Sequence, residues 1–143
     1  DHSCLRKVES WIVPSSTTSV RVRYAETDQM QVAYHANYFV WFEVGRCDLL
    51  CTLGHSYRDL EATGLMLPVI EAQCEFRRST RYDDELWIVT RGSLLSGARI
   101  KFDYEVLRQQ DRAVTAFGRT VHAAVNQKGR PTRLPPELRG VLE

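Results

Sequence analysis

One segment of the sequence combines a side chain and a stretch of backbone that together suit acyl chemistry. Asp28 lies seven residues before His35, in a loop that leads into the strongest helix pattern of the chain, Asn37 to Leu53. The first turn of a helix has unpaired N–H groups and a partial positive charge, so it can hold an anion or a carbonyl oxygen that becomes negative. A carboxylate beside such donors is the minimum equipment for acyl transfer, because one group attacks or activates water while the other binds the oxyanion.

The same residue types also have a structural interpretation. An aspartate in a loop before a helix often makes an Asx-turn or a cap, and a lone histidine is more often packed than catalytic. Glu43 and Arg46, three residues apart on the helix, most simply form a surface ion pair. His122, which shares a strand face with Thr120 and Ala124, is most simply structural. Spacing alone therefore leaves catalysis open.

The elements that would hold this segment follow from hydrophobic periodicity. Residues 19–24 alternate apolar and charged side chains, which predicts a half-buried strand, and a loop over 25–36 follows it. The helix from Asn37 to Leu53 is apolar almost all round, which predicts burial on every side. Asn37 is the expected N-cap, and Gly54 the expected residue after the helix end.

Beyond this helix, a short second helix is predicted to open at Ser56 and to end at Gly64. From there the hydrophobic period changes from 3.6 to 2, which is typical of strands. Four antiparallel strands are predicted over residues 69–77, 85–91, 99–108 and 113–125. A final helical turn is predicted over residues 135–138.

One sheet wrapped around one helix is an α+β arrangement. With 143 residues the chain has the length of one domain, and we expect an irregular segment over 1–18 and a single domain over 19–143. A sheet covered by only one helix leaves strand edges and a face without partners. Pairing with a second copy would cover them, so we expect an oligomer.

The composition excludes several classes of protein. Lys and Arg number 19 against 18 Asp and Glu, which argues against a dedicated nucleic-acid binder. No apolar run is long enough to span a membrane, and no signal peptide is visible. The cysteines, with no C-x-x-C pair, are typical of free thiols in a reducing compartment, and neither they nor the histidines have metal-ligand spacing. They are Cys4, Cys47, Cys51 and Cys74, and His2, His35, His55 and His122.

The stretch from Arg23 to Glu43 resembles the signature of hotdog-fold acyl-CoA thioesterases of the 4-hydroxybenzoyl-CoA thioesterase-like superfamily, especially its Tol–Pal-associated branch. That signature has an Asp after a short strand, a His or Tyr seven positions on, then a small residue, an Asn or Ser, and an aromatic residue that starts the central helix. Asp28, His35, Asn37 and Tyr38 match it, and the resemblance extends over about residues 19–138.

The resemblance implies a hotdog fold, an antiparallel sheet around a long central helix, and hydrolysis of an acyl-CoA thioester to a free acid and CoA. Asp28 would be the general base or the nucleophile. The N–H of His35 would bind the thioester oxygen, and its imidazole could assist proton transfer. Glu43 would be a second candidate carboxylate. Contacts to substrate and to the CoA phosphates would come from Tyr38, Arg130 and Arg133.

Many relatives have a Gly-rich run after the Asp, where this chain has Gln29-Met30-Gln31, a difference that concerns the acyl pocket more than the reaction. The resemblance implies no cofactor apart from the CoA of the substrate, a dimer or a dimer of dimers, and a bacterial cytoplasmic location. The alternatives are an acyl-carrier-protein thioesterase and a non-catalytic acyl-binding or scaffolding hotdog protein. A hotdog dehydratase or hydratase is disfavoured, because its H-F-P-type or Asp-x-Asn-Pro-x-His loop is absent.

Overall fold

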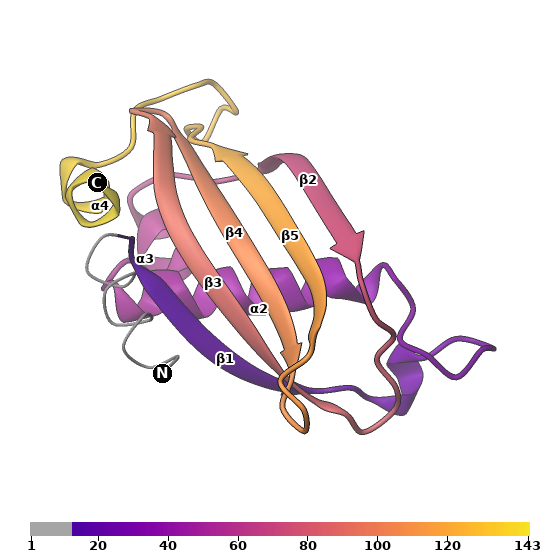
Figure 1. Ribbon diagram of the computed structural model, residues 1–143. Helices are drawn as coiled ribbons and strands as arrows, with labels where there is room; N and C mark the ends of the chain where they lie inside the picture. Colours follow the sequence, from indigo (N-terminus) through magenta and orange to yellow (C-terminus); the bar gives the residue numbers. More distant parts are fainter. Residues whose placement is uncertain (1–12) are drawn as a thin grey trace.

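A five-stranded antiparallel sheet curves around one long helix in the computed structural model, which describes residues 13–143 (Figure 1). The strand order is β1-β3-β4-β5-β2, so β1 and β2 form the two edges. This confirms the predicted α+β class. The strands are β1 Ser15–Arg21, β2 Val69–Phe76, β3 Glu85–Ser96, β4 Arg99–Arg108 and β5 Val114–Ala123. The helices are the 3₁₀-helix η1 Tyr24–Glu26 and the α-helices α2 Asn37–Thr52, α3 Tyr57–Ala62 and α4 Pro136–Leu142.

Three predicted strand boundaries are wrong, and one of them is the end of β1, which lies at Arg21 instead of Tyr24. β1 begins at Ser15, so residues 15–18 are not irregular, and residues 1–12 lie outside the described part of the chain. These Ser and Thr residues pair with β3 in register from Ser15 opposite Arg91. β3 itself continues to Ser96 instead of ending at Arg91. In both places the partner strand determines the extent of the ladder, which side-chain polarity alone does not reveal.

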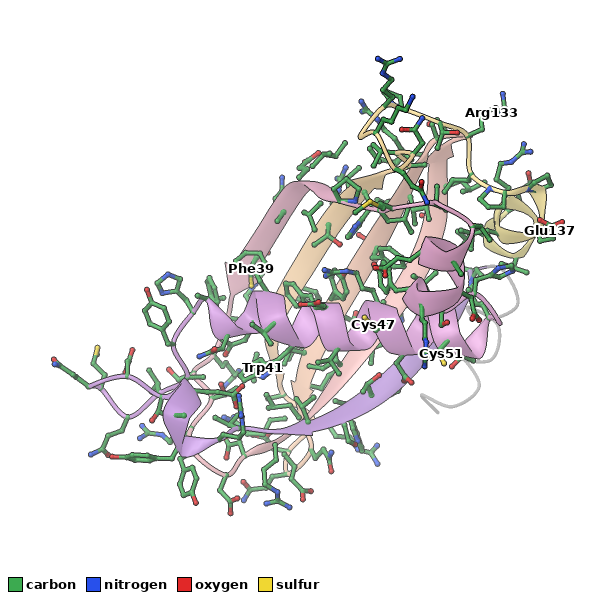
Figure 2. All side chains as sticks on the ribbon, turned by 180° about the vertical axis from the view of Figure 1, so that it is seen from behind. Phe39, Trp41, Cys47, Cys51, Arg133 and Glu137 are labelled. Carbon is green, nitrogen blue, oxygen red and sulfur yellow. The ribbon has the colours of Figure 1, made fainter. Side chains whose placement is uncertain are left out.

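Helix α2 lies across the concave side of the sheet, with Phe39 directed toward β2 and Trp41 toward β1 (Figure 2). Gly45 allows the close approach, because a Cβ there would stand 2.3 Å from the Thr90 hydroxyl oxygen of β3. Farther along the helix the Phe42 ring stacks on Tyr104 with centroids 4.3 Å apart. These contacts fix the helix, and with it the first turn that carries the candidate site.

The predicted burial of α2 is found within one chain only on the face toward the sheet. Its outward face exposes Phe39, Val40 and Val44 by 37–48%, and Cys51 is exposed too. The sheet of one chain covers only one side of the helix, so these apolar residues stay partly exposed, although the Phe39 ring meets that of Phe42 edge-on with centroids 5.7 Å apart. No helix among those residues is long and apolar enough to cross a membrane.

A buried chain of hydrogen bonds crosses the core below α2, and it gives His122 the structural role expected from the sequence. His122 is fully buried, with Nδ1 2.9 Å from the Leu67 carbonyl and Nε2 2.9 Å from the Thr120 hydroxyl. Because a carbonyl only accepts, Nδ1 carries the proton and Nε2 accepts from Thr120. The Tyr104 hydroxyl, 2.6 Å from Thr120, donates to it in turn. Burial lowers the pKa of His122 from 6.5 to about 4.

This shift predicts acid sensitivity of the fold. Between pH 6.5 and pH 4 the unfolded chain binds a proton at His122 and the folded chain does not, so stability present above pH 6.5 is lost as the pH falls through this window. The loss amounts to about 3 kcal/mol in all. Urea unfolding of the wild type and of His122→Asn at pH 7 and pH 4.5 measures it. An equal acid loss in both proteins would assign the effect to other groups.

Candidate active site

Asp28 begins a tight hairpin that projects between η1 and α2. Its N–H donates to the Val32 carbonyl at 2.9 Å, its carbonyl accepts the Gln31 N–H at 2.9 Å, and Thr27 bridges to Ala33. Gln31 has a φ of 64°, so the hairpin has the common three-residue form in which a turn is followed by a left-handed residue. Glycine suits that conformation best, which gives a backbone reason for the Gly-rich run that many relatives have at this place.

The side chain of Asp28 is held by its own hairpin. Its Oδ1 accepts the Met30 N–H at 2.8 Å, so the Asx-turn of the structural interpretation is present. This bond uses one carboxylate oxygen and orients the other. The Asx-turn therefore fixes the carboxylate without removing its capacity to act as a base or nucleophile.

The start of α2 differs from the expected cap. Asn37 is the first helical residue, and Ala36 occupies the N-cap position with no side-chain cap. The Asn37 side chain instead donates to the Glu26 carbonyl at 2.8 Å, while its N–H closes a turn on the Tyr34 carbonyl at 3.0 Å. Within the described residues, neither the His35 nor the Ala36 N–H donates a hydrogen bond. An uncapped helix start thus keeps two donors available to a ligand.

A hollow of about 310 Å³ opens at this end of α2. His35 is exposed on its rim and makes an edge-to-face contact with Phe76, with ring centroids 6.3 Å apart. Asp28 is bonded through its main chain to Val32, which also lines the hollow, but Asp28 itself is not among the lining residues. The lining residues are Val32, Ala33, His35, Tyr38, Phe76, Arg77, Arg78 and Ser79.

Tyr38 lines this hollow with its ring rather than with a free hydroxyl. The residue is buried, its hydroxyl lies 3.0 Å from that of Thr80, and burial raises its pKa. A contact between Tyr38 and substrate would therefore be made mainly by the aromatic ring.

Glu43 lies in a different hollow, of about 290 Å³, between α2 and β2. The expected surface ion pair with Arg46 is absent from the described residues. Arg46 instead turns inward and donates from Nε to the Tyr57 hydroxyl at 3.2 Å. Glu43 is exposed and stands apart from the hollow that holds His35.

Arg130 and Arg133 occupy the other end of the sheet from the start of α2, where Figure 2 shows Arg133. Arg130 lines a hollow of about 480 Å³ with Thr63, Asn126 and Lys128. Arg133 lies against the β3–β4 turn, where a Cβ on Gly97 would meet its guanidinium at 2.9 Å. Within one chain the two arginines do not join the hollow beside Asp28.

Sequence reasoning missed three residues at the site. Arg77 and Arg78 line the His35 hollow, and a basic pair at the end of a predicted strand was the signal for them. Glu26 is a buried acid among loop residues and had no such signal.

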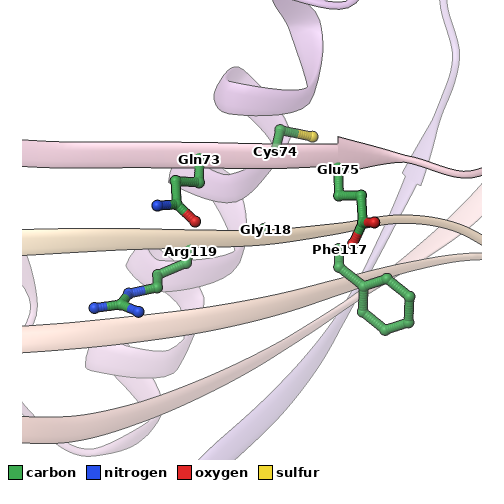
Figure 3. Close-up of a pocket in the computed structure, with 6 residues that line it drawn as sticks. All are labelled: Gln73, Cys74, Glu75, Phe117, Gly118 and Arg119. Atoms are coloured by element: carbon green, nitrogen blue, oxygen red, sulfur yellow. The ribbon is translucent and has the colours of Figure 1, made fainter.

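A further hollow of about 520 Å³ between the edge strand β2 and β5 contains none of the predicted site residues (Figure 3). It is lined by Gln73, Cys74, Glu75, Phe117, Gly118 and Arg119.

Comparisons with known proteins agree with this architecture. The family model described as the thioesterase-like superfamily matches residues 22–142. An acyl-CoA thioesterase of Haemophilus influenzae, YbgC, is 32% identical over 126 residues, which cover 86% of this chain and 90% of that protein.

Solved structures give the same result. The Staphylococcus aureus DHNA-CoA thioesterase superposes with a TM-score of 0.80 at 34% identity, covering 84% of this chain and 80% of that one. A hypothetical protein of Thermus thermophilus, TT1821, superposes with a TM-score of 0.83 at 36% identity over 89% of this chain and 96% of that one. These matches confirm the hotdog fold expected from the sequence.

Proposed function

The chain belongs to the thioesterase-like superfamily, and from this premise we propose that it hydrolyses an acyl-CoA thioester to a free acid and coenzyme A. The observation that supports the proposal is the uncapped start of α2, where the N–H groups of residues 35 and 36 lack partners among the described residues and His35 lines a hollow. The hairpin that carries Asp28 leads into this helix start and bonds through its main chain to Val32, another residue of the hollow.

These groups divide the work of hydrolysis between them. With the thioester oxygen on the N–H groups at the helix start, the carbonyl carbon becomes more electrophilic and the negative charge of the tetrahedral intermediate is stabilised. Asp28 either takes a proton from the attacking water or attacks the carbonyl carbon itself to give a mixed anhydride, which water then hydrolyses to the free acid and the restored carboxylate. In both routes the C–S bond breaks, and the CoA sulfur leaves as a thiolate that then takes up a proton. No cofactor besides the CoA of the substrate is proposed.

Thiol release from a panel of acyl-CoAs, aromatic and aliphatic, tests the function directly. A thioesterase liberates free thiol from at least one member, whereas a non-catalytic acyl-binding protein liberates none. The same acyl groups on acyl carrier protein separate the two thioesterase alternatives, since an enzyme specific for the carrier protein would leave every CoA ester intact.

We propose that the nucleotide phosphates of CoA contact Arg130 and Arg133. Replacing both with Ala is expected to raise the KM for an acyl-CoA about tenfold and to spare kcat, because the lost contacts are the same in ground state and transition state. The effect should shrink as salt is raised. The matching N-acetylcysteamine thioester, which lacks the nucleotide, serves as control. An unchanged KM for acyl-CoA would refute the phosphate contacts, and equal damage to both thioesters would point to the fold.

We propose that the working unit is a symmetric oligomer in which two chains meet along β2. This strand is a free edge of the sheet, and its first two residues, Val69 and Ile70, are 45% and 48% exposed. A second copy would pair with this free edge strand and cover the exposed apolar residues on the outward face of α2.

Sedimentation is therefore expected to give a mass above that of the 16.5 kDa monomer. Ile70→Lys should shift the protein toward monomer and lower its activity. Leu95→Lys is a matched control, because Leu95 is also 48% exposed but lies at the end of β3. A fully active wild-type monomer would contradict the proposal.

A further inference from the structure

A buried carboxylate next to the proposed catalytic loop has no place in the mechanism above. Glu26 is only 6% exposed, although it lies at the end of the short 3₁₀-helix η1 and two residues before Asp28. A buried acid is costly unless it is hydrogen-bonded, and the bonds that Glu26 makes connect the segments before and after the Asp28 hairpin with the first turns of α2.

The carboxylate of Glu26 joins the N-cap of η1, two residues after β1, to the second turn of α2. Its Oε1 accepts the Arg23 N–H at 2.7 Å and lies 3.5 Å from the Arg23 guanidinium, while its Oε2 accepts the indole N–H of Trp41 at 3.2 Å. A carboxylate offers acceptors on both oxygens, so it matches two converging donors. A glutamine would place an NH₂ group against one of them.

The main-chain carbonyl of Glu26 accepts two further hydrogen bonds, from residues that follow the Asp28 hairpin. Its carbonyl accepts the Tyr34 N–H at 2.8 Å and the Asn37 side-chain amide at 2.8 Å. Residues 34 and 37 bracket the two free N–H groups at the start of α2. Glu26 thereby connects three parts: the strand that enters the site, the hairpin that carries Asp28, and the helix start that carries the donors.

We propose that Glu26 is a positioning residue that sets the Asp28 carboxylate against the free N–H groups of residues 35 and 36. The inference rests on the proposed hydrolase function. A displacement of about 1 Å between a catalytic group and the reacting carbon costs about 100-fold in rate. Loss of the Glu26 carboxylate therefore acts on kcat through Asp28, whereas substrate binding farther along the pocket is preserved.

The test compares Glu26→Gln with a variant of equal stability loss elsewhere. Glu26→Gln is expected to lower kcat at least about tenfold with KM within about twofold of wild type. Leu142→Ala removes a buried side chain from α4, away from the hairpin (Figure 1), and is expected to keep its kcat at a comparable Tm. Both are assayed well below their Tm values.

A second pair of variants removes the donor that would face the NH₂ group of glutamine at position 26. In Glu26→Gln/Trp41→Phe the indole N–H is gone, so the glutamine NH₂ faces no donor and part of the kcat should return. Trp41→Phe alone keeps an aromatic ring in the core and should lower kcat by a few-fold with KM preserved. This variant tests the positioning role if Glu26→Gln does not fold.

The outcomes separate this inference from the function on which it rests. Wild-type kcat in folded Glu26→Gln, or an equal loss of kcat in Leu142→Ala, would overturn the positioning role of Glu26. The proposed hydrolase function would still stand in that case if Asp28→Asn is inactive in the same assay. A wild-type protein that releases thiol from neither the acyl-CoAs nor the matching acyl-carrier-protein esters overturns both.

Discussion

Asp28→Asn is expected to lower kcat for thioester hydrolysis by at least about 10²-fold, which is the low end for removal of a general base. The substitution takes away both possible functions of the carboxylate, as base and as nucleophile. It keeps the local structure, because the Asn side-chain oxygen can still accept the Met30 N–H that now bonds to Oδ1 at 2.8 Å. The Tm should therefore remain close to that of the wild type.

Steady-state kinetics of the purified variant, together with a thermal melt, measure this effect. Glu43→Gln is the matched control, since it neutralises the other candidate carboxylate in the separate hollow between α2 and β2. Near-wild-type turnover in Asp28→Asn with a large loss in Glu43→Gln would transfer the catalytic role to the helix.

The fold was largely predictable because its periodic patterns are strong. The helix that starts at Asn37 and the four later strands were placed within a few residues, apart from the longer β3. The errors have a common cause. The polar start of β1 is a strand only because β3 pairs with it, and the outward face of α2 is apolar although no part of the described chain covers it. Both depend on partners distant in the sequence or on a second copy.

The site was predictable in position but not in its connections. A resemblance drew attention to Asp28 and His35, and in the structure His35 lies at the start of α2 while Asp28 begins the hairpin that leads into it. The resemblance could not reveal that the Asn37 side chain donates to the Glu26 carbonyl. Nor could the sequence reveal that Arg46 turns inward to Tyr57 and forms no ion pair with Glu43 within the described residues. Such bonds depend on the directions of side chains after folding, which spacing along one helix does not determine.

The two possible roles of His35 can be separated by a pair of substitutions at that residue. His35→Ala removes the imidazole and keeps the N–H, whereas His35→Pro removes both. The structure favours proline here, because the Asn37 N–H to Tyr34 carbonyl bond of 3.0 Å makes His35 the second residue of a turn. Proline is common at that position, and within the described residues the His35 N–H makes no bond that proline would break.

If the N–H binds the thioester oxygen, His35→Pro should lower kcat by about 10²- to 10³-fold, the usual effect of losing one oxyanion donor. His35→Ala should then lose about tenfold or less, because its donor is intact. If the imidazole transfers a proton, His35→Ala alone should already lose about 10²-fold or more. Kinetics on one acyl-CoA distinguish these results, with folding checked by circular dichroism. Equal, small losses in both variants would show that neither group of His35 takes part in the reaction.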